Sequence, residues 1–468
     1  IVVLSMKNSP WIFLFLIFDY LSALLAWALF FYLRKIWIEN EPFEADDNFW
    51  LGLFLIPIFW MFLYFIQGTY QEMRRMFRLK LLNLTLSGSL LGSLVIFFAI
   101  ILDDQVRDYE GYYWNALILF GVHFTMTAVP RLLINTLLIH SIRVKGKGFR
   151  TVIIGGTEKA VDIYKEIIKN PKNVNSFVGY VNMNGNDRKL DDVLPYLGHF
   201  DQLDKVIPTI EVDEYIIAIE SAEHNKLMNI LLKIDNHSSR IKTLPDTYAI
   251  LSGKVKMTNI YGALLLEVIS DVMPFWQRVV KRFMDFILSF IAIILLIPFY
   301  LFSAIAVKAS SRGPVFFLQD RVGKNGKIFK IIKFRTMIVN AEIDGPQLSS
   351  KDDPRITKVG KFMRKTRLDE FPQFLNVLIG DMSIVGPRPE RQFYIDQIAK
   401  IQPQYNQLTK VRPGITSWGQ VKYGYAENVD QMLQRMKFDL LYLKNRSLSL
   451  DLKIMFYTLI IVLKAEGK

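Results

Sequence analysis

Two adjacent acidic residues, Asp369 and Glu370, stand inside a strongly basic stretch of the sequence. Residues 308–412 contain twice as many Lys and Arg residues as Asp and Glu residues. Phosphoryl transfer spreads negative charge over oxygen atoms, so cations must surround it, and Arg suits phosphate best. A carboxylate can attack phosphorus or bind a divalent metal together with phosphate. The pair is therefore a candidate phosphoryl-transfer site, although acidic pairs in general are mostly solvated or cap helices.

Short motifs predict the elements that position this pair. Asn325-Gly326 between two apolar runs predicts a hairpin, whose return strand, residues 328–336, carries basic side chains. We expect the loop at residues 352–357 to lead into a helix that is also basic. The basic residues of the strand and the helix include Lys333, Arg335, Lys361, Arg364, Lys365 and Arg367.

Four apolar runs near the start of the chain are each long enough to cross a bilayer, which takes about 20 residues. They cover residues 11–33, 49–66, 81–102 and 112–139. The loops after the first and third runs are acidic, and those after the second and fourth are basic. Because basic loops remain in the cytoplasm, everything after residue 140 is predicted to be cytoplasmic.

Two charged residues, Asp19 and Arg131, interrupt these runs. Charged residues inside a membrane are functional candidates by default. We expect Asp19 to face the interior of the helix bundle and Arg131 to reach the cytoplasmic surface. We assign no chemistry to either residue.

Residues 146–272 alternate strand and helix patterns, which predicts an open, largely parallel Rossmann-like sheet. The first strand, residues 151–154, ends in Gly155-Gly156 and leads into a helix, as in dinucleotide-binding folds. The third glycine of that fingerprint is absent. A structural or regulatory domain is therefore favoured, with a bound nicotinamide cofactor as the alternative.

Residues 283–307 form a fifth apolar run with basic residues on both sides. Both ends should then stay in the cytoplasm, whereas a straight fifth span would carry the rest of the chain outside. Pro298 lies within the run, where a proline removes a backbone hydrogen bond and kinks a helix. We predict a re-entrant helix that breaks at Pro298 and returns to the same face, with a straight span as the alternative.

The composition excludes several classes of protein. Hydrophobic residues make up 51% of the chain, which excludes a disordered protein. The absence of cysteine excludes disulfides, iron–sulfur clusters, thiolate zinc sites and a cysteine nucleophile. The net charge of +13 suits lipid headgroups or phosphorylated ligands, and the membrane spans argue against nucleic acid as a partner.

Seven motifs in residues 283–423 resemble those of one family. They are Arg321-Val322-Gly323, Lys333-Phe334-Arg335-Thr336-Met337, Leu368-Asp369-Glu370-Phe371-Pro372-Gln373, Asn376-Val377-Leu378, Gly380-Asp381-Met382-Ser383, Gly386-Pro387-Arg388-Pro389 and Arg412-Pro413-Gly414-Ile415-Thr416. This stretch resembles the bacterial polyisoprenyl-phosphate sugar-1-phosphate transferases, or monotopic phosphoglycosyl transferases. The whole chain resembles their large, undecaprenyl-phosphate hexose-1-phosphate transferase type.

The resemblance implies a membrane protein of three parts. Residues 1–145 would be a four-helix transmembrane bundle, and residues 146–272 a Rossmann-like α/β domain. Residues 273–468 would be an α+β catalytic domain, anchored by a re-entrant helix at residues 283–307. The catalytic domain would lie on the cytoplasmic face of the bacterial inner membrane, and the large members of the family suggest a homodimer.

The resemblance also implies a reaction. Such enzymes transfer a sugar 1-phosphate from a UDP-sugar to undecaprenyl phosphate, releasing UMP, to begin a capsule, exopolysaccharide or O-antigen lipopolysaccharide unit. Asp369 would be the covalent nucleophile. Glu370 would support it, either by holding Mg²⁺ with Asp369 or by assisting deprotonation of the acceptor. The cations that bind substrate phosphate would be Lys333, Arg335, Arg364 and Arg388.

Other interpretations remain open at this stage. A glycosyltransferase that moves the sugar alone would release UDP, and a membrane scaffold for polysaccharide assembly would have no catalysis. The chain also departs from the family: Ile297 replaces a Ser before Pro298, and residues 421–427 lack a usual Gly-Arg-Asn sequence. The donor sugar is therefore left open. The last apolar segment, residues 448–464, should either lie on the membrane or dock as a helix.

Overall fold

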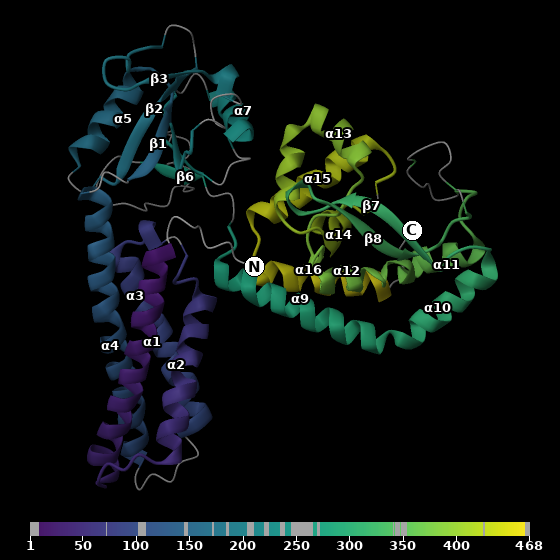
Figure 1. Ribbon diagram of the computed structural model, residues 1–468. Coiled ribbons are helices and arrows are strands. Elements are labelled where there is room, and N and C mark those ends of the chain that lie inside the picture. The colour runs from purple at the N-terminus through teal and green to yellow at the C-terminus, as the bar shows by residue number, and fades with distance from the viewer. Residues whose placement is uncertain are drawn as a thin grey trace. The chain divides into compact units, whose positions relative to one another are not determined.

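The structure is a computed structural model (Figure 1). It describes residues 9–71, 73–101, 109–144, 148–170, 173–183, 187–203, 210–219, 224–234, 239–244, 265–268, 272–339, 341, 347, 353–424 and 426–463. The chain divides into two compact units, Ile1–Val268 and Ile269–Lys468. The first contains the apolar bundle and the α/β domain, and the second contains the family motifs.

Four helices of the first unit are long and apolar enough to cross a membrane, and they lie where the four spans are predicted. They are α1 Ser9–Leu33, α2 Asp47–Gln67, α3 Arg78–Ile96 and α4 Tyr109–Val144. Two π-helical turns, η2 Arg34–Glu39 and η4 Phe97–Ile101, extend α1 and α3, and a 3₁₀ turn, η3 Met73–Arg75, precedes α3.

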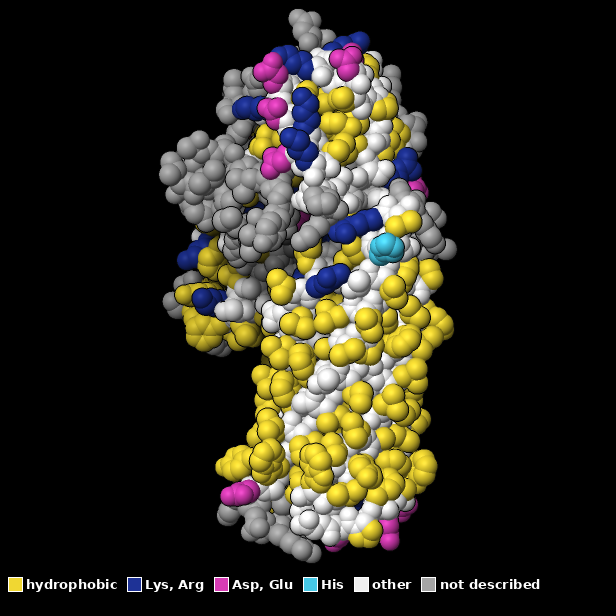
Figure 2. Space-filling model, turned by 90° about the vertical axis from the view of Figure 1, so that its left-hand side faces the viewer, with side chains coloured by type: hydrophobic (Ala, Val, Ile, Leu, Met, Phe, Trp, Pro, Cys, Tyr) yellow, Lys and Arg dark blue, Asp and Glu magenta, His cyan; other side chains and the backbone are white. Residues whose placement is uncertain are grey.

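The outer surface of the bundle is apolar. Figure 2 shows a broad hydrophobic band, with acidic side chains at its lower end and Lys and Arg side chains where the band ends above. Phe13, Phe62 and Leu133 are among the exposed apolar residues. Such a surface is suited to lipid rather than to water. The third loop, with its acidic residues at 103, 104 and 108, lies outside the described residues.

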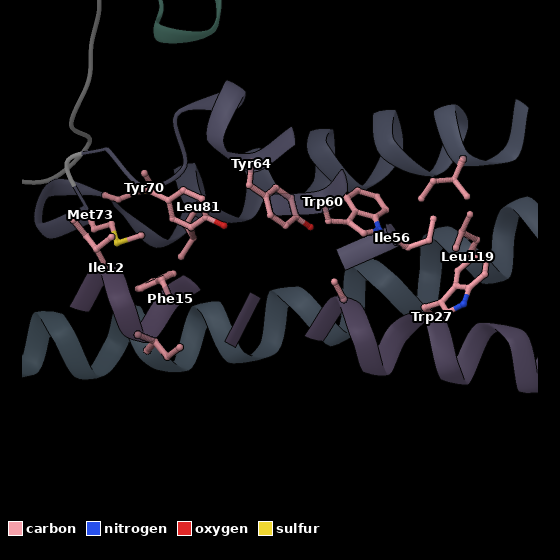
Figure 3. Packing of buried hydrophobic residues seen from close by; sticks show 14 of the residues in the cluster. Ile12, Phe15, Trp27, Ile56, Trp60, Tyr64, Tyr70, Met73, Leu81 and Leu119 are labelled. Carbon is pink, nitrogen blue, oxygen red and sulfur yellow. The ribbon is translucent and has the colours of Figure 1, made fainter. Parts of the chain in front are cut away.

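Aromatic side chains fill the interior of the bundle (Figure 3). Trp60 and Tyr64 of α2 are fully buried, and Trp27 of α1 is nearly so. The ring of Trp60 stacks on His123 of α4, and the Tyr64 hydroxyl forms a hydrogen bond of 2.6 Å with the same imidazole. These contacts join helices that are distant in sequence.

A buried ion pair also crosses the bundle. Arg131 donates from Nε to Asp19 Oδ1 at 2.7 Å and from Nη2 to Asp19 Oδ2 at 2.8 Å. Thr85 of α3 and the Tyr70 hydroxyl bind the same pair. The expectation that Asp19 faces the interior is therefore confirmed. The expectation that Arg131 reaches the cytoplasmic surface is wrong, because its guanidinium is 1% exposed and turns toward Asp19.

The α/β domain contains a six-stranded sheet in the order β3-β2-β1-β4-β5-β6. All pairs are parallel except β5 with β6, which confirms a largely parallel sheet. The strands are β1 Phe149–Ile154, β2 Asn175–Asn182, β3 Tyr196–His199, β4 Glu214–Ile217, β5 Arg240–Thr243 and β6 Leu266–Val268. Helices α5 Glu158–Lys169 and α7 His224–Ile234 accompany them, and a 3₁₀ turn, η5 Phe200–Gln202, follows β3.

The second unit begins with two apolar helices, α9 Phe275–Leu295 and α10 Ile297–Ser310, bent by 62° relative to each other. The bend lies at Leu296, two residues before Pro298, which stands in the first turn of α10. This break falls where the sequence predicts one. A proline has no amide hydrogen to continue the helix, so the ladder of hydrogen bonds is interrupted here.

The rest of this unit is a small α+β domain (Figure 1). It contains the antiparallel hairpin β7–β8 and the parallel pair β9–β10. The strands are β7 Phe316–Val322, β8 Ile328–Phe334, β9 Ser383–Val385 and β10 Gly414–Thr416. The helices and 3₁₀ turns are η8 Lys324–Gly326, α11 Lys358–Thr366, η9 Leu368–Glu370, α12 Gln373–Ile379, α13 Gln392–Ile401, η10 Pro403–Lys410, α14 Trp418–Lys422, α15 Val429–Lys444 and α16 Leu448–Leu463.

Polar contacts fix α9 to this domain. Asp285 is buried on the inner face of α9, where it accepts hydrogen bonds from the Ser383 hydroxyl at 2.8 Å and the Ile384 amide at 3.1 Å. Lys281 binds Asp451 of α16 at 2.7 Å. The outer face of α9 and α10 exposes large apolar side chains such as Phe290 and Phe302. Helix α16 packs against β9, β10 and α14, so it is docked, while Leu452 and Phe456 remain exposed.

Candidate active site

Asp369 and Glu370 lie in the 3₁₀ turn η9, between α11 and α12. Helix α11 begins at the Thr357 cap, whose hydroxyl oxygen accepts the Gly360 amide hydrogen at 2.9 Å. It ends at Arg367, which adopts a left-handed conformation with φ of 57°. This conformation is uncommon for a residue with a side chain, and it turns the chain into η9. Both acidic side chains are buried, at 8% and 5% exposure.

Two cations from distant segments bind Glu370. Lys333 of β8 places its Nζ 3.1 Å from Glu370 Oε1, and Arg388 Nη1 lies 3.6 Å from the same oxygen. Asn376 of α12 fixes this arrangement because its side chain binds both the Ile332 amide and the Lys330 carbonyl of β8. The hairpin and α12 therefore hold Lys333 against the acidic pair.

The surroundings shift the pKa values of the two carboxyl groups in opposite directions. Burial, followed by the negative charge of Glu370, raises the pKa of Asp369 above its usual value. Burial also opposes ionisation of Glu370, but Lys333 and Arg388 together hold the pKa of that carboxyl below its usual value. Glu370 is thus the more acidic member of the pair, and Asp369 is the more basic one.

The other two predicted cations, Arg364 and Arg335, differ in their relation to the acidic pair. Arg364 of α11 donates from Nε to the Thr336 hydroxyl oxygen at 2.9 Å, and its charge stabilises the ionised Asp369. Arg335 points elsewhere: its Nη2 donates to the Ser311 carbonyl at 2.7 Å and to the Ser311 hydroxyl oxygen. Within the described part of the chain, no hydrogen bond or ion pair links Arg335 to the acidic pair. Its role in binding substrate phosphate remains a prediction.

Sequence reasoning did not identify a third buried carboxylate, Glu390. It lies directly after the Gly-Pro-Arg-Pro motif and is 5% exposed. It forms ion pairs with Arg321 of β7 and Arg435 of α15, and Arg388 Nε lies 3.9 Å away. The sequence places Glu390 two residues after Arg388, which could have indicated a role in the site. Its other two partners, Arg321 and Arg435, lie 69 and 45 residues away along the chain.

The described residues hold no group of three or more His, Asp or Glu side chains that could bind a metal ion. Asp369 and Glu370 alone supply two adjacent carboxylates. This is the number that Mg²⁺ commonly takes from a protein when it shares its other ligands with substrate phosphates and water. The donor set therefore fits a magnesium ion that binds together with a phosphorylated substrate.

Residues 276–465, which include every residue of this site, match the family model described as "Bacterial sugar transferase". Along nearly its whole length (98% of both chains), the protein is 30% identical to an uncharacterized sugar transferase of Haemophilus influenzae. It is 32% identical to the UDP-glucose:undecaprenyl-phosphate glucose-1-phosphate transferase of Xanthomonas campestris, over 81% of this chain and 80% of that protein.

The chain belongs to the bacterial sugar transferase family. This confirms the family membership predicted from the motifs. A third relative of this sugar transferase, at 43% identity, is the UDP-N-acetylgalactosamine-undecaprenyl-phosphate N-acetylgalactosaminephosphotransferase of Aeromonas hydrophila. That match spans about half of each protein, 48% of this chain and 52% of the relative.

Residues 65–245 of this sugar transferase match a second family model, described as "CoA-binding domain". The glycines after β1 do not form an open cradle for a ligand. A side chain on Gly155 would clash with the Ala218 carbonyl, and one on Gly156 would clash with the Asp187 carbonyl. Both glycines therefore allow the chain to pack on itself.

Proposed function

We propose that this sugar transferase moves a sugar 1-phosphate from a UDP-sugar to undecaprenyl phosphate, releasing UMP and forming an undecaprenyl-diphosphate sugar. The observation that carries the proposal is the buried Asp369–Glu370 pair, with one pKa raised and the other lowered, beside Lys333, Arg364 and Arg388. The names of the Aeromonas and Xanthomonas relatives describe the same class of reaction. The product would begin a capsule, exopolysaccharide or O-antigen unit.

In the first step, an Asp369 carboxylate oxygen attacks the β-phosphorus of the donor, which carries the sugar. The bond from this phosphorus to the bridging oxygen breaks, and UMP leaves with the electron pair. An acyl phosphate links Asp369 to the sugar. A raised pKa makes Asp369 a stronger nucleophile than an ordinary carboxylate, provided that it is ionised.

In the second step, a phosphate oxygen of undecaprenyl phosphate attacks the same phosphorus. The bond to Asp369 breaks, and the carboxylate returns to its starting state. Total charge is the same before and after each step when the acceptor is a dianion, so no net proton transfer is required. If the acceptor is a monoanion, it must lose its proton before the attack, and Glu370 is a weak base for that proton because Lys333 and Arg388 lower the pKa of its carboxyl group.

The cations stabilise charge that builds up during both steps. Lys333 and Arg388 bind Glu370 in the absence of substrate, and donor phosphate oxygens compete for the same two side chains. The charge of Arg364 acts on Asp369 and favours its ionised form. When bound by Asp369 and Glu370, Mg²⁺ would neutralise diphosphate charge. Loss of activity in a chelator, restored by added Mg²⁺, would support this ion; activity that resists chelation would remove it from the proposal.

We further propose that α9 and α10 form a re-entrant membrane anchor. The 62° bend, the exposed apolar faces and the basic residues at both ends support a helix pair that enters and leaves on one side. The catalytic domain would then lie on the cytoplasmic face of the inner membrane. A reporter fused after residue 320 tests this topology, because a periplasmic signal would require a straight fifth span.

The reaction itself is tested by the nucleotide released. Detergent-purified protein, Mg²⁺ and undecaprenyl phosphate are incubated with a panel of UDP-sugars, beside an Asp369→Asn control. We expect acceptor-dependent UMP from one sugar, which also identifies the donor. Release of UDP would indicate a glycosyltransferase. Release from no sugar, together with an Asp369→Asn variant that still supports polysaccharide synthesis in cells, would indicate a scaffold. We also propose a homodimer, which light scattering of the purified protein tests.

A further inference from the structure

We propose that Glu390 is a positioning residue for this transfer reaction: its buried carboxylate fixes the direction in which Arg388 faces the Asp369–Glu370 pair. The proposal rests on the proposed function, because it concerns the same site. Glu390 itself need not touch the donor or the acceptor.

Glu390 is a rigid anchor. Its carbonyl oxygen accepts the Val322 amide hydrogen at 3.0 Å, which ties its backbone to the end of β7. Its Oε2 lies 3.3 Å from Arg321 Nη1, and its Oε1 forms an ion pair with Arg435 of α15. Burial opposes ionisation, but the charges of Arg435 and Arg321 keep the pKa of Glu390 below its usual value. The carboxylate is therefore charged and bound by two arginines, and the backbone of the same residue is fixed to β7.

Arg388 lies between two carboxylates. Its Nε is 3.9 Å from Glu390 Oε1, and its Nη1 is 3.6 Å from Glu370 Oε1. A guanidinium group is planar and its N–H donors have a fixed geometry. A contact at Nε therefore also determines the direction in which Nη1 points. A donor phosphate would compete with Glu370 for Nη1. Glu390 would remain in contact with Nε throughout, so Arg388 would not have to reorient during the reaction.

The competing explanation is that Glu390 only docks α15 through Arg435. The two explanations differ in what they predict for catalysis. Docking predicts that Arg435→Met and Glu390→Gln have equal effects on kcat, since both remove the same ion pair. Positioning predicts that Glu390→Gln lowers kcat much more, because only this change removes the charge that faces Arg388.

The experiment measures UMP release by the full-length protein in detergent, with undecaprenyl phosphate and the UDP-sugar that supports release. For Glu390→Gln we expect kcat to fall on the order of 10- to 100-fold, the scale of a small misplacement in an active site, with a much smaller change in KM. The control is Asp396→Asn, an exposed carboxylate on α13, which should keep wild-type kcat. Thermal unfolding of each variant separates lost stability from lost catalysis.

A double-mutant cycle supplies the decisive readout. If Glu390 acts through Arg388, Glu390→Gln should cause little further loss of kcat in an Arg388→Gln background. Fully multiplicative losses would overturn the proposal, and so would equal kcat losses in Glu390→Gln and Arg435→Met. Should Glu390→Gln fail to fold, Glu390→Asp keeps the charge but withdraws it from Arg388. A folded Glu390→Asp variant with wild-type kcat would also overturn the proposal.

The experiment distinguishes this inference from the proposed function. If the wild-type protein releases no UMP with any UDP-sugar, the proposed function fails and this inference fails with it. If the wild-type protein is active and Glu390→Gln matches it, only the role of Glu390 is lost.

Discussion

At the scale of single residues, the chemistry depends on two neighbouring carboxylates that do not behave alike. Sequence alone predicted Asp369, Glu370, Lys333 and Arg388 because they lie in recognisable motifs, and Arg364 because it lies in the predicted basic helix before Asp369. It could not predict the electrostatic difference within the pair. That difference comes from burial and from cations on separate elements, which only the folded chain brings together.

Contacts between distant segments explain both the residue that was missed, Glu390, and the position of Arg335 away from the acidic pair. Glu390 is bound by side chains from β7 and α15, and the spacing of residues near Glu390 in the sequence does not indicate these contacts. Arg335 stands in a motif beside Lys333, yet its guanidinium binds Ser311 at the end of α10. A motif indicates that a residue matters, whereas the fold decides what its side chain touches.

The pH dependence follows from the raised pKa of Asp369. Only the ionised carboxylate can attack phosphorus, so exchange of UMP into the donor should fall as pH drops through that pKa, beginning at a higher pH than for an ordinary aspartate. Glu370→Gln removes a neighbouring negative charge, so the acidic limb of the residual activity should move to lower pH. A limb that stays in place or moves to higher pH would contradict the electrostatic assignment. The measurement is the rate of exchange from pH 4 to pH 8, roughly the range over which such groups titrate.

At the scale of elements, the sequence predicted the hairpin, the basic helix and the break near Pro298 well, because turn residues and apolar periods are local signals. Two strands of the α/β sheet, β3 and β6, were not predicted. Both are short, with four and three residues, and among the described strands β6 pairs with β5 alone. Their strand conformation is a consequence of the sheet they join rather than of their own pattern.

The attachment of α9 to the catalytic domain gives a prediction at this scale. Asp285→Ala would leave the Ser383 hydroxyl and the Ile384 amide without their charged acceptor. We expect the free energy of unfolding to fall by about 2–3 kcal/mol, the cost of losing hydrogen bonds to a buried charged group. Thermal unfolding in detergent measures this, with Asp396→Ala on the surface of α13 as the control. An unchanged midpoint would show that the other contacts of α9, which include the Lys281–Asp451 ion pair, hold it in place without Asp285.

At the scale of the whole molecule, the length of the apolar runs was enough to predict four helices that could cross a membrane. It was not enough to place Arg131, because its partner Asp19 lies 112 residues earlier on another helix. The pair joins α1 to α4, and Thr85 adds α3. This network links three helices of the bundle in a buried interior, where the two charges have each other rather than water as partners.

The ion pair in the bundle predicts a non-additive effect. Either Asp19→Leu or Arg131→Met leaves one buried charge without its partner and should destabilise the bundle by about 3–5 kcal/mol. The double variant removes both charges and should recover much of that loss. Unfolding of the three variants, followed by tryptophan fluorescence, measures the effect. Equal and additive losses would contradict the pairing of these two residues.

The central claim is that Asp369 forms a covalent link to the phospho-sugar. The most direct test incubates the protein with its UDP-sugar and labelled UMP, without undecaprenyl phosphate. A covalent intermediate predicts that label enters the UDP-sugar in the wild-type protein and not in Asp369→Asn. An active preparation that shows no exchange, or an Asp369→Asn variant that still exchanges, would contradict the account.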